Sequence, residues 1–195
     1  TTIPLSYLRS HLAIIPQDPT LFRGTVRSNI DPFNEHTDLE LWSALRKVCL
    51  AGDEGNEPDE EEKDGPHNKP AALKLDTVVE DDGRNFSIGQ RQLLGFARAL
   101  VRSSRITVLD EATSSVDLAT DRRIQQNIAM WFQGRTLICI AHRLHTVLAC
   151  DRIVVMDRGQ IAEGDPPLRL WERDGGIFRG MCDRSGITRA DLDCL

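Results

Sequence analysis

A short apolar run, Ile106 to Leu109, ends abruptly at two neighbouring carboxylates, Asp110 and Glu111. Such a run is typical of a strand buried in a parallel sheet. Ligands of open α/β sheets bind at the carboxyl ends of the strands, which is where these acids stand. Because side chains alternate along a strand, one carboxylate can hold Mg²⁺ while the other orients or deprotonates an attacking water. The run therefore predicts an α/β fold with a reactive sheet edge.

The segment before this strand carries a capping box. Ser87 and Gln90 stand three residues apart, so each side chain can cap the backbone N–H of the other at a helix start. Gly89 has no side chain, so unpaired N–H groups and the positive end of the helix dipole can face a phosphate. Apolar residues recur at helical spacing over 93–101. The alternative interpretation is an amphipathic helix with an ordinary cap and no ligand.

Two further candidates follow predicted strands. The strand His11–Ile15 leads into Gln17, in a loop flanked by prolines that could also be a simple strand exit. The strand Arg135–Ala141 leads into His142, again at the sheet edge where ligands bind. A zinc site at His142 and His145 is not expected, because no matching cluster of acids or cysteines accompanies them.

Local patterns predict several other elements. Residues 1–10 are expected to form a surface lead-in, and Thr37 with Glu40 makes a second capping box that opens a structural helix. Arg158 and Gly159 are flanked by two strand-like runs, which predicts a hairpin. Closing helices are expected over 167–173 and 176–182.

The charge of the chain is concentrated in one segment. The formal charge is −6, and residues 53–64 hold eight acids against Lys63 alone, which leaves about +1 elsewhere. This balance argues against a general nucleic-acid binder. Residues 52–70 have few apolar side chains and three prolines, so we expect a mobile insertion there.

Cysteine usage and hydropathy limit the cellular compartments in which the chain is expected. The five cysteines are odd in number and form no Cys-x-x-Cys pair, so neither a disulfide framework nor a zinc site is indicated, and a reduced, cytosolic setting fits best. No apolar run approaches the roughly 18 residues of a membrane span, and the N-terminus has no signal-peptide pattern. A membrane role would have to come from another part of a longer polypeptide or from a partner.

The motifs together resemble one family. Phe-Ser-Ile-Gly-Gln-Arg-Gln at 86–92 and Val-Leu-Asp-Glu-Ala-Thr-Ser-Ser-Val-Asp at 108–117 resemble the signature, Walker B and D-loop of an ABC-transporter nucleotide-binding domain. Gln17 matches its Q-loop, and Ile-Ala-His-Arg-Leu at 140–144 matches its H-loop. The resemblance implies a RecA-like P-loop NTPase core, incomplete at its N-terminus, with a helical signature subdomain.

The resemblance also implies ATP and Mg²⁺ as ligands. Asp110 would hold Mg²⁺, Gln17 would reach Mg²⁺ and the attacking water, and Glu111 would be the general base. His142 would lie beside the γ-phosphate. Asp117 would cross to the opposing ATP site, although it could equally be an ordinary helix N-cap. The implied nucleotide-binding residues are Ser87, Ile88, Gly89, Gln90 and Asp117.

The family pattern predicts a division of the chain into four parts. Residues 1–17 would be a remnant of the core up to the Q-loop, and 18–90 the helical subdomain, with its insertion at 52–70. Residues 91–165 would carry the core with Walker B, D-loop and H-loop. Residues 166–195 would form C-terminal helices and a tail.

Two departures refine the placement. No glycine is followed by lysine, so the Gly-x₄-Gly-Lys-Ser/Thr phosphate loop is missing, and we expect a fragment or truncated gene product that is inactive by itself. Ile88 replaces a signature glycine, which predicts slow turnover at that site. A complete Walker B with an altered signature resembles the second nucleotide-binding domain of C-subfamily exporters, and Asp-Pro-Phe at 31–33 is typical of that subfamily. The ending at 177–187 resembles the fungal oligomycin-resistance type within it.

That placement implies partners and a location. The partners would be the first nucleotide-binding domain and the transmembrane domains of the same transporter, at the cytosolic face of a plasma or vacuolar membrane. Neither nucleic acid nor direct membrane insertion is expected. Two alternatives remain: a noncatalytic remnant that acts as a regulatory module, and a soluble ABC ATPase that acts on nucleic acid or ribosomes.

Overall fold

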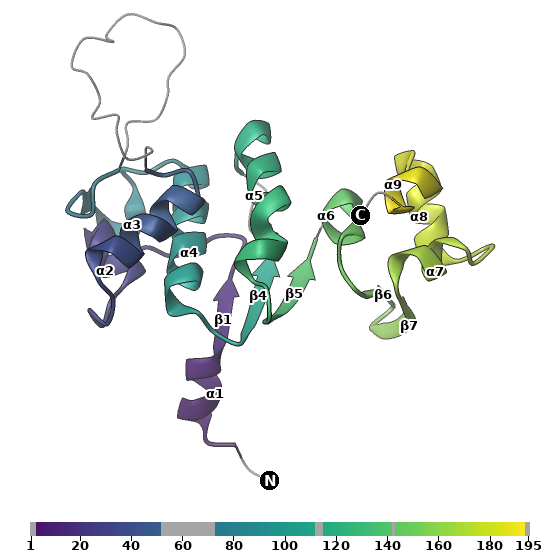
Figure 1. Ribbon diagram of the computed structural model, residues 1–195, viewed down its shortest axis with the longest axis horizontal. Helices are drawn as coiled ribbons and strands as arrows, with labels where there is room; N and C mark the ends of the chain where they lie inside the picture. Colours follow the sequence, from purple (N-terminus) through teal and green to yellow (C-terminus); the bar gives the residue numbers. More distant parts are fainter. Residues whose placement is uncertain (1–2, 52–72, 112–114, 142, 194–195) are drawn as a thin grey trace, which may run out of the picture. The chain divides into compact units, whose positions relative to one another are not determined.

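The computed structural model describes residues 3–51, 73–111, 115–141 and 143–193. It divides into two compact units, Thr1–Ile140 and Ala141–Leu195 (Figure 1). The predicted insertion at 52–70 and the candidate residue His142 lie outside the described residues.

The first unit contains a parallel three-stranded sheet in the order β1-β4-β5, as the arrows in Figure 1 show. The strands are β1 (Leu12–Ile15), β4 (Ile106–Asp110) and β5 (Thr136–Ile140). The register places Ile15 opposite Leu109. The carboxyl ends of all three strands therefore meet at one edge of the sheet, as the buried run before Asp110 predicts.

The two faces of this sheet differ in burial. Ile15 and Leu109 are buried in the hydrophobic cluster that includes residues of α4 and α5. On the opposite face Ile14, Ile138 and Ile140 are 63%, 49% and 54% exposed. The strand predicted at 135–141 is confirmed as β5. Only one face of β5 is covered, because, among the described elements, α4 and α5 pack on the face that carries Leu109.

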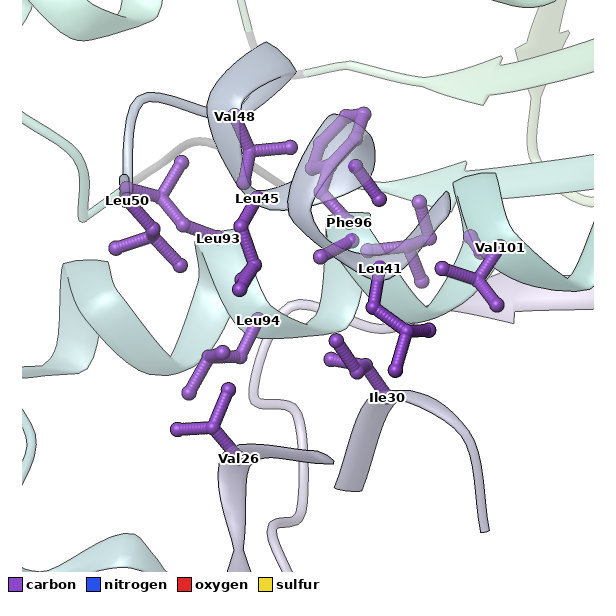
Figure 2. Packing of buried hydrophobic residues seen from close by; sticks show 14 of the residues in the cluster. Val26, Ile30, Leu41, Leu45, Val48, Leu50, Leu93, Leu94, Phe96 and Val101 are labelled. Carbon is purple, nitrogen blue, oxygen red and sulfur yellow. The ribbon is translucent and has the colours of Figure 1, made fainter. Parts of the chain in front are cut away.

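Helix α4 (Ile88–Arg102) is the centre of the hydrophobic cluster. Figure 2 shows its Leu94 and Phe96, both fully buried, beside side chains from α2 (Val26–Ile30) and α3 (Asp38–Lys47). The apolar spacing predicted this helix, and Ser103 at φ 53° ends it in a left-handed cap. The packing fixes the position of the helix start at Ser87.

Capping boxes begin both α2 and α3. Thr37 and Glu40 form the predicted box, in which the Glu40 carboxylate accepts from the Thr37 N–H at 2.8 Å. Thr25 and Ser28 form another at the start of α2. These caps satisfy backbone N–H groups that the first helical turn leaves unpaired.

Four short elements and one long helix complete the described part of this unit. The remaining elements are α1 (Leu5–His11), β2 (Gly24–Thr25), β3 (Val78–Val79), which pairs antiparallel with β2, the 3₁₀ turn η1 (Asp81–Gly83) and α5 (Leu118–Trp131). The surface lead-in predicted at 1–10 contains most of helix α1, which the sequence reasoning did not predict. Its Tyr7 and His11 rings, one turn apart, stack at 4.1 Å, and none of its residues is buried.

The second unit is a hairpin with four helices among its described residues. Arg158 and Gly159 both have positive φ, 47° and 78°, which is the geometry of a two-residue type I′ hairpin, and the prediction is confirmed. The Glu163 carboxylate accepts from the backbone N–H groups of Ile177 and Phe178, and so caps α8. The elements are α6 (Leu144–Leu148), β6 (Ile153–Asp157), β7 (Gln160–Asp165), α7 (Pro167–Trp171), α8 (Ile177–Ser185) and α9 (Arg189–Asp193).

Candidate functional site

Gln17 and Glu111 meet at the carboxyl edge of the sheet. Gln17 follows β1 and Glu111 follows β4, and the Gln17 side-chain Nε2 donates a hydrogen bond to Glu111 Oε2 at 3.1 Å. The two residues are 94 positions apart in the chain. The parallel register brings them together, because neighbouring strands end at the same level. An amide and a carboxylate that touch at this edge can act on one ligand.

The backbone at Glu111 holds its carboxylate in a defined place. Its φ is 48°, in the left-handed region that non-glycine residues rarely adopt. Its N–H donates to the Ile140 carbonyl of β5 at 3.0 Å, which secures this conformation. Such conformations cost on the order of 1–3 kcal/mol and gather at active sites. The bond to β5 therefore fixes the direction of the Glu111 side chain.

Asp110 is the last residue of β4 and stands opposite Ile140 in the register. Asp110 shares a sheet face with Val108. Glu111 follows the end of β4 and has a positive φ, so the two carboxylates point in different directions, as expected. Asp110, Glu111 and the Gln17 amide offer the oxygen donors that Mg²⁺ prefers. No group of three or more His, Cys, Asp or Glu side chains gathers in the described part of the chain. The donor set still fits Mg²⁺, which uses one or two carboxylates together with substrate phosphates.

The predicted capping box at the start of α4 is confirmed. The Ser87 hydroxyl oxygen accepts from the Gln90 N–H at 3.1 Å, and Gln90 Oε1 accepts from the Ser87 N–H at 2.9 Å. A hydroxyl that accepts one bond can still donate another. Ile88, the first helical residue, is 53% exposed. The helix start thus presents a branched apolar side chain to its surroundings.

Gly89 has a role within the chain that the phosphate hypothesis did not include. A Cβ at this position would lie 2.9 Å from the Ser115 carbonyl oxygen and 3.6 Å from Val116 Cα. Only a residue without a side chain lets the backbone of 115–116 approach the helix so closely. Gly89 therefore joins the start of α4 to the segment that follows β4.

Asp117 is the N-cap of α5. Its Oδ2 accepts from the Thr120 backbone N–H at 2.9 Å, and this bond, followed by a side-chain bond to Thr120, holds the pKa of the Asp117 carboxyl below its usual range. The N-cap interpretation of Asp117 is confirmed. A contact with an opposing ATP site stays a prediction.

Replacement of this cap should lower stability in a pH-dependent way. Because the folded pKa is depressed, the stabilisation is present above the unfolded pKa of about 3.9 and is lost as pH falls through the folded pKa. We expect Asp117→Ala to cost about 1 kcal/mol at pH 7 and less at pH 3.5, by urea unfolding of the purified chain. Asp117→Asn, which keeps an acceptor, is the control. A cost that did not shrink between these pH values would contradict the role of the charge.

Gln92 is a site residue that the sequence reasoning missed. Its side chain is fully buried, Nε2 donates to the Gln17 carbonyl at 2.8 Å, and Oε1 accepts from the Ser115 N–H at 3.0 Å. The signal in the sequence is a glutamine directly before the apolar residues of an amphipathic helix. A buried amide must find partners, so such a residue joins segments distant in the chain.

These features are those of an α/β domain with a ligand site at the carboxyl edge of its sheet. A parallel sheet carries an amide–carboxylate pair at its carboxyl edge, and a capped helix start lies against the loop that follows the central strand. The sequence profile of the ABC transporter family matches residues 2–114, more than half of the chain. The chain belongs to the ABC transporter family, and the family assignment implies nucleotide binding.

Curated relatives are transporters, and the name of one of them places it in sub-family C. The chain is 60% identical over 194 residues to the ABC-type transporter cicA of Emericella nidulans, an alignment that covers 98% of this chain and 14% of that protein. It is 53% identical over 192 residues to the oligomycin resistance ATP-dependent permease YOR1 of Saccharomyces cerevisiae (95% and 13%). ATP-binding cassette sub-family C member 4 of Mus musculus is 44% identical over 190 residues (97% and 13%). The chain thus spans about a seventh of the length of these relatives.

A solved structure confirms the fold. A bacterial Atm1-family ABC exporter with ATP bound superposes with a TM-score of 0.76 at 32% identity, over 94% of this chain and 30% of that chain. The predicted ABC ATPase fold is confirmed. Within the described residues, no helix combines the length and apolar character needed to cross a membrane.

Proposed function

We propose that the chain is the later portion of the second nucleotide-binding domain of a C-subfamily ABC exporter, in which ATP binding and hydrolysis drive export across a membrane. The observation that carries the proposal is the hydrogen bond between Gln17 and Glu111, with Glu111 held at positive φ at the end of β4. A carboxylate fixed in this way is suited to accept a proton.

Glu111 would be the general base for ATP hydrolysis. Its carboxylate would take a proton from the attacking water, and the Gln17 amide would orient that carboxylate and the water. Asp110 and Gln17 would hold Mg²⁺, which when bound neutralises charge on the phosphates. His142 would donate a hydrogen bond near the γ-phosphate, as its motif suggests.

The start of α4 would serve a second ATP molecule. Ser87, Gly89 and Gln90 would present N–H and hydroxyl groups to a γ-phosphate bound by the first nucleotide-binding domain, and Asp117 would reach the same interface. Ile88 is exposed where the family pattern has glycine, so close approach to the phosphate is hindered. This second site would turn over slowly, while the Glu111 site carries most of the hydrolysis.

The partners proposed are the first nucleotide-binding domain and the transmembrane domains of the same transporter. The names of the relatives, a transporter and a permease, support a place in a membrane transporter. We place the chain at the cytosolic face of a plasma or vacuolar membrane. The low charge outside the acidic segment gives no support to nucleic acid as a partner.

The proposal predicts a contrast between the 195-residue chain and the full transporter. We expect the purified chain to bind ATP poorly and to release no phosphate above background, since these residues include no glycine–lysine pair of a phosphate loop. Full-length protein in inside-out vesicles should hydrolyse ATP and accumulate substrate in an ATP-dependent manner. Hydrolysis by the 195-residue chain at ordinary enzyme rates, lost in a Glu111→Gln variant, would contradict the expectation.

A further inference from the structure

Gln92 is a fully buried polar side chain on α4, next to Leu93 and Leu94 of the hydrophobic cluster. A buried amide without partners would cost on the order of 1–3 kcal/mol, so its bonds determine where it is tolerated. Both ends of the amide are bonded, Nε2 to the Gln17 carbonyl and Oε1 to the Ser115 N–H, which are backbone groups of other segments.

These bonds form a chain that ends at the proposed base. The Ser115 N–H donates to Gln92 Oε1 (3.0 Å), Gln92 Nε2 donates to the Gln17 carbonyl (2.8 Å), and Gln17 Nε2 donates to Glu111 Oε2 (3.1 Å). Gln92 is thus bonded to segments 75 residues before it and 23 after it. Gln92 also lies one helical turn after Gly89, where the Ser115 carbonyl leaves no room for a Cβ.

We propose that Gln92 is a positioning residue for ATP hydrolysis: it holds the main chain of Gln17 so that the Gln17 amide meets the Glu111 carboxylate. The inference rests on the proposed function of Gln17 and Glu111. Helix α4 is anchored by its buried apolar residues, so it provides a rigid support for a residue in its second turn. A shift of about 1 Å in a catalytic group can cost about 10²-fold in rate, so this support has a kinetic consequence.

Two variants of Gln92 separate positioning from packing. Gln92→Glu keeps the length of the side chain and an acceptor for the Ser115 N–H, but an ionised carboxylate cannot donate to the Gln17 carbonyl. Gln92→Met fills a similar volume and removes both bonds. Gln126→Glu, at an exposed position of α5, is the matched control for the added charge.

In the full-length transporter at pH 8, both Gln92 variants should lower kcat by about 10-fold to 10²-fold with KM for ATP changed less than about twofold. The pH dependence adds a second readout. We expect burial to raise the pKa of the carboxyl group in the Gln92→Glu variant. When it is protonated it can donate, so the kcat of Gln92→Glu relative to wild type should rise as pH falls toward 6. The ratio for Gln92→Met should stay flat.

The outcomes distinguish this inference from the proposed function. Wild-type kcat in both Gln92 variants, or equal and pH-independent losses in both, would overturn the positioning role while ATP hydrolysis by the transporter stood. An inactive wild-type transporter, or full activity in Glu111→Gln, would overturn the proposed function and this inference with it. Gln126→Glu should follow the wild type at every pH.

Discussion

Glu111→Gln in the full-length transporter is expected to reduce steady-state ATP hydrolysis by about 10²- to 10⁴-fold and to leave ATP binding intact. A glutamine has nearly the same shape and still accepts the hydrogen bond from Gln17 Nε2, but it cannot take a proton from water. The backbone bond from residue 111 to the Ile140 carbonyl is unaffected by the change. The loss should therefore appear in kcat, measured by phosphate release in proteoliposomes.

The control for this variant is Glu35→Gln, which removes a carboxylate from an exposed loop before α3. It should hydrolyse ATP and transport at the wild-type rate. Transport by Glu111→Gln near the wild-type rate would show that another group accepts the proton. Loss of ATP binding in Glu111→Gln would show that the residue supports the fold or the ligand instead of the chemical step.

Among the variants proposed for stability measurements, Phe96→Ala should lower the free energy of unfolding most, by about 3–5 kcal/mol. Phe96 is fully buried, with 0% of its surface exposed, within the cluster around α4 (Figure 2). Truncation removes its buried apolar surface and leaves a cavity that rigid neighbours fill only in part. Because domains have net stabilities of about 5–15 kcal/mol, a large fraction of the chain should unfold at low urea concentration.

Phe33→Ala provides the comparison, because Phe33 is 79% exposed. A substitution at such a surface position should change the unfolding free energy by less than about 0.5 kcal/mol. Urea unfolding of the purified chain, followed by circular dichroism, measures both variants. Similar midpoints for Phe96→Ala and wild type would contradict the central place of α4 in the core.

Much of the local structure could be predicted from the sequence because its causes are local. The Ser87 and Thr37 caps follow from side chains three residues away, and the hairpin at Arg158 and Gly159 follows from its flanking strands. The α1 helix was missed, since it has no buried residue and therefore no amphipathic pattern. The exposure of Ile138 was also missed, because an apolar strand does not reveal which of its faces is covered.

The candidate site was predictable only as separate motifs. Strand ends pointed to Gln17 and Glu111, but their hydrogen bond depends on the register between β1 and β4, which no local pattern determines. Gln92 and the closed space at Gly89 depend on contacts with Ser115, so they become visible only when distant segments are packed together. The positive φ of Glu111 is likewise a result of its bond to β5.

The most direct test is the chemical identity of the nucleotide retained by the full-length Glu111→Gln transporter. The protein is incubated with Mg²⁺ and α-labelled ATP, separated from free nucleotide by gel filtration, and the retained label is resolved by chromatography. If Glu111 accepts the proton from the attacking water, the label is recovered as ATP, whereas the wild type yields ADP. Recovery of ADP from Glu111→Gln in the wild-type proportion would contradict the assignment of Glu111 as the base.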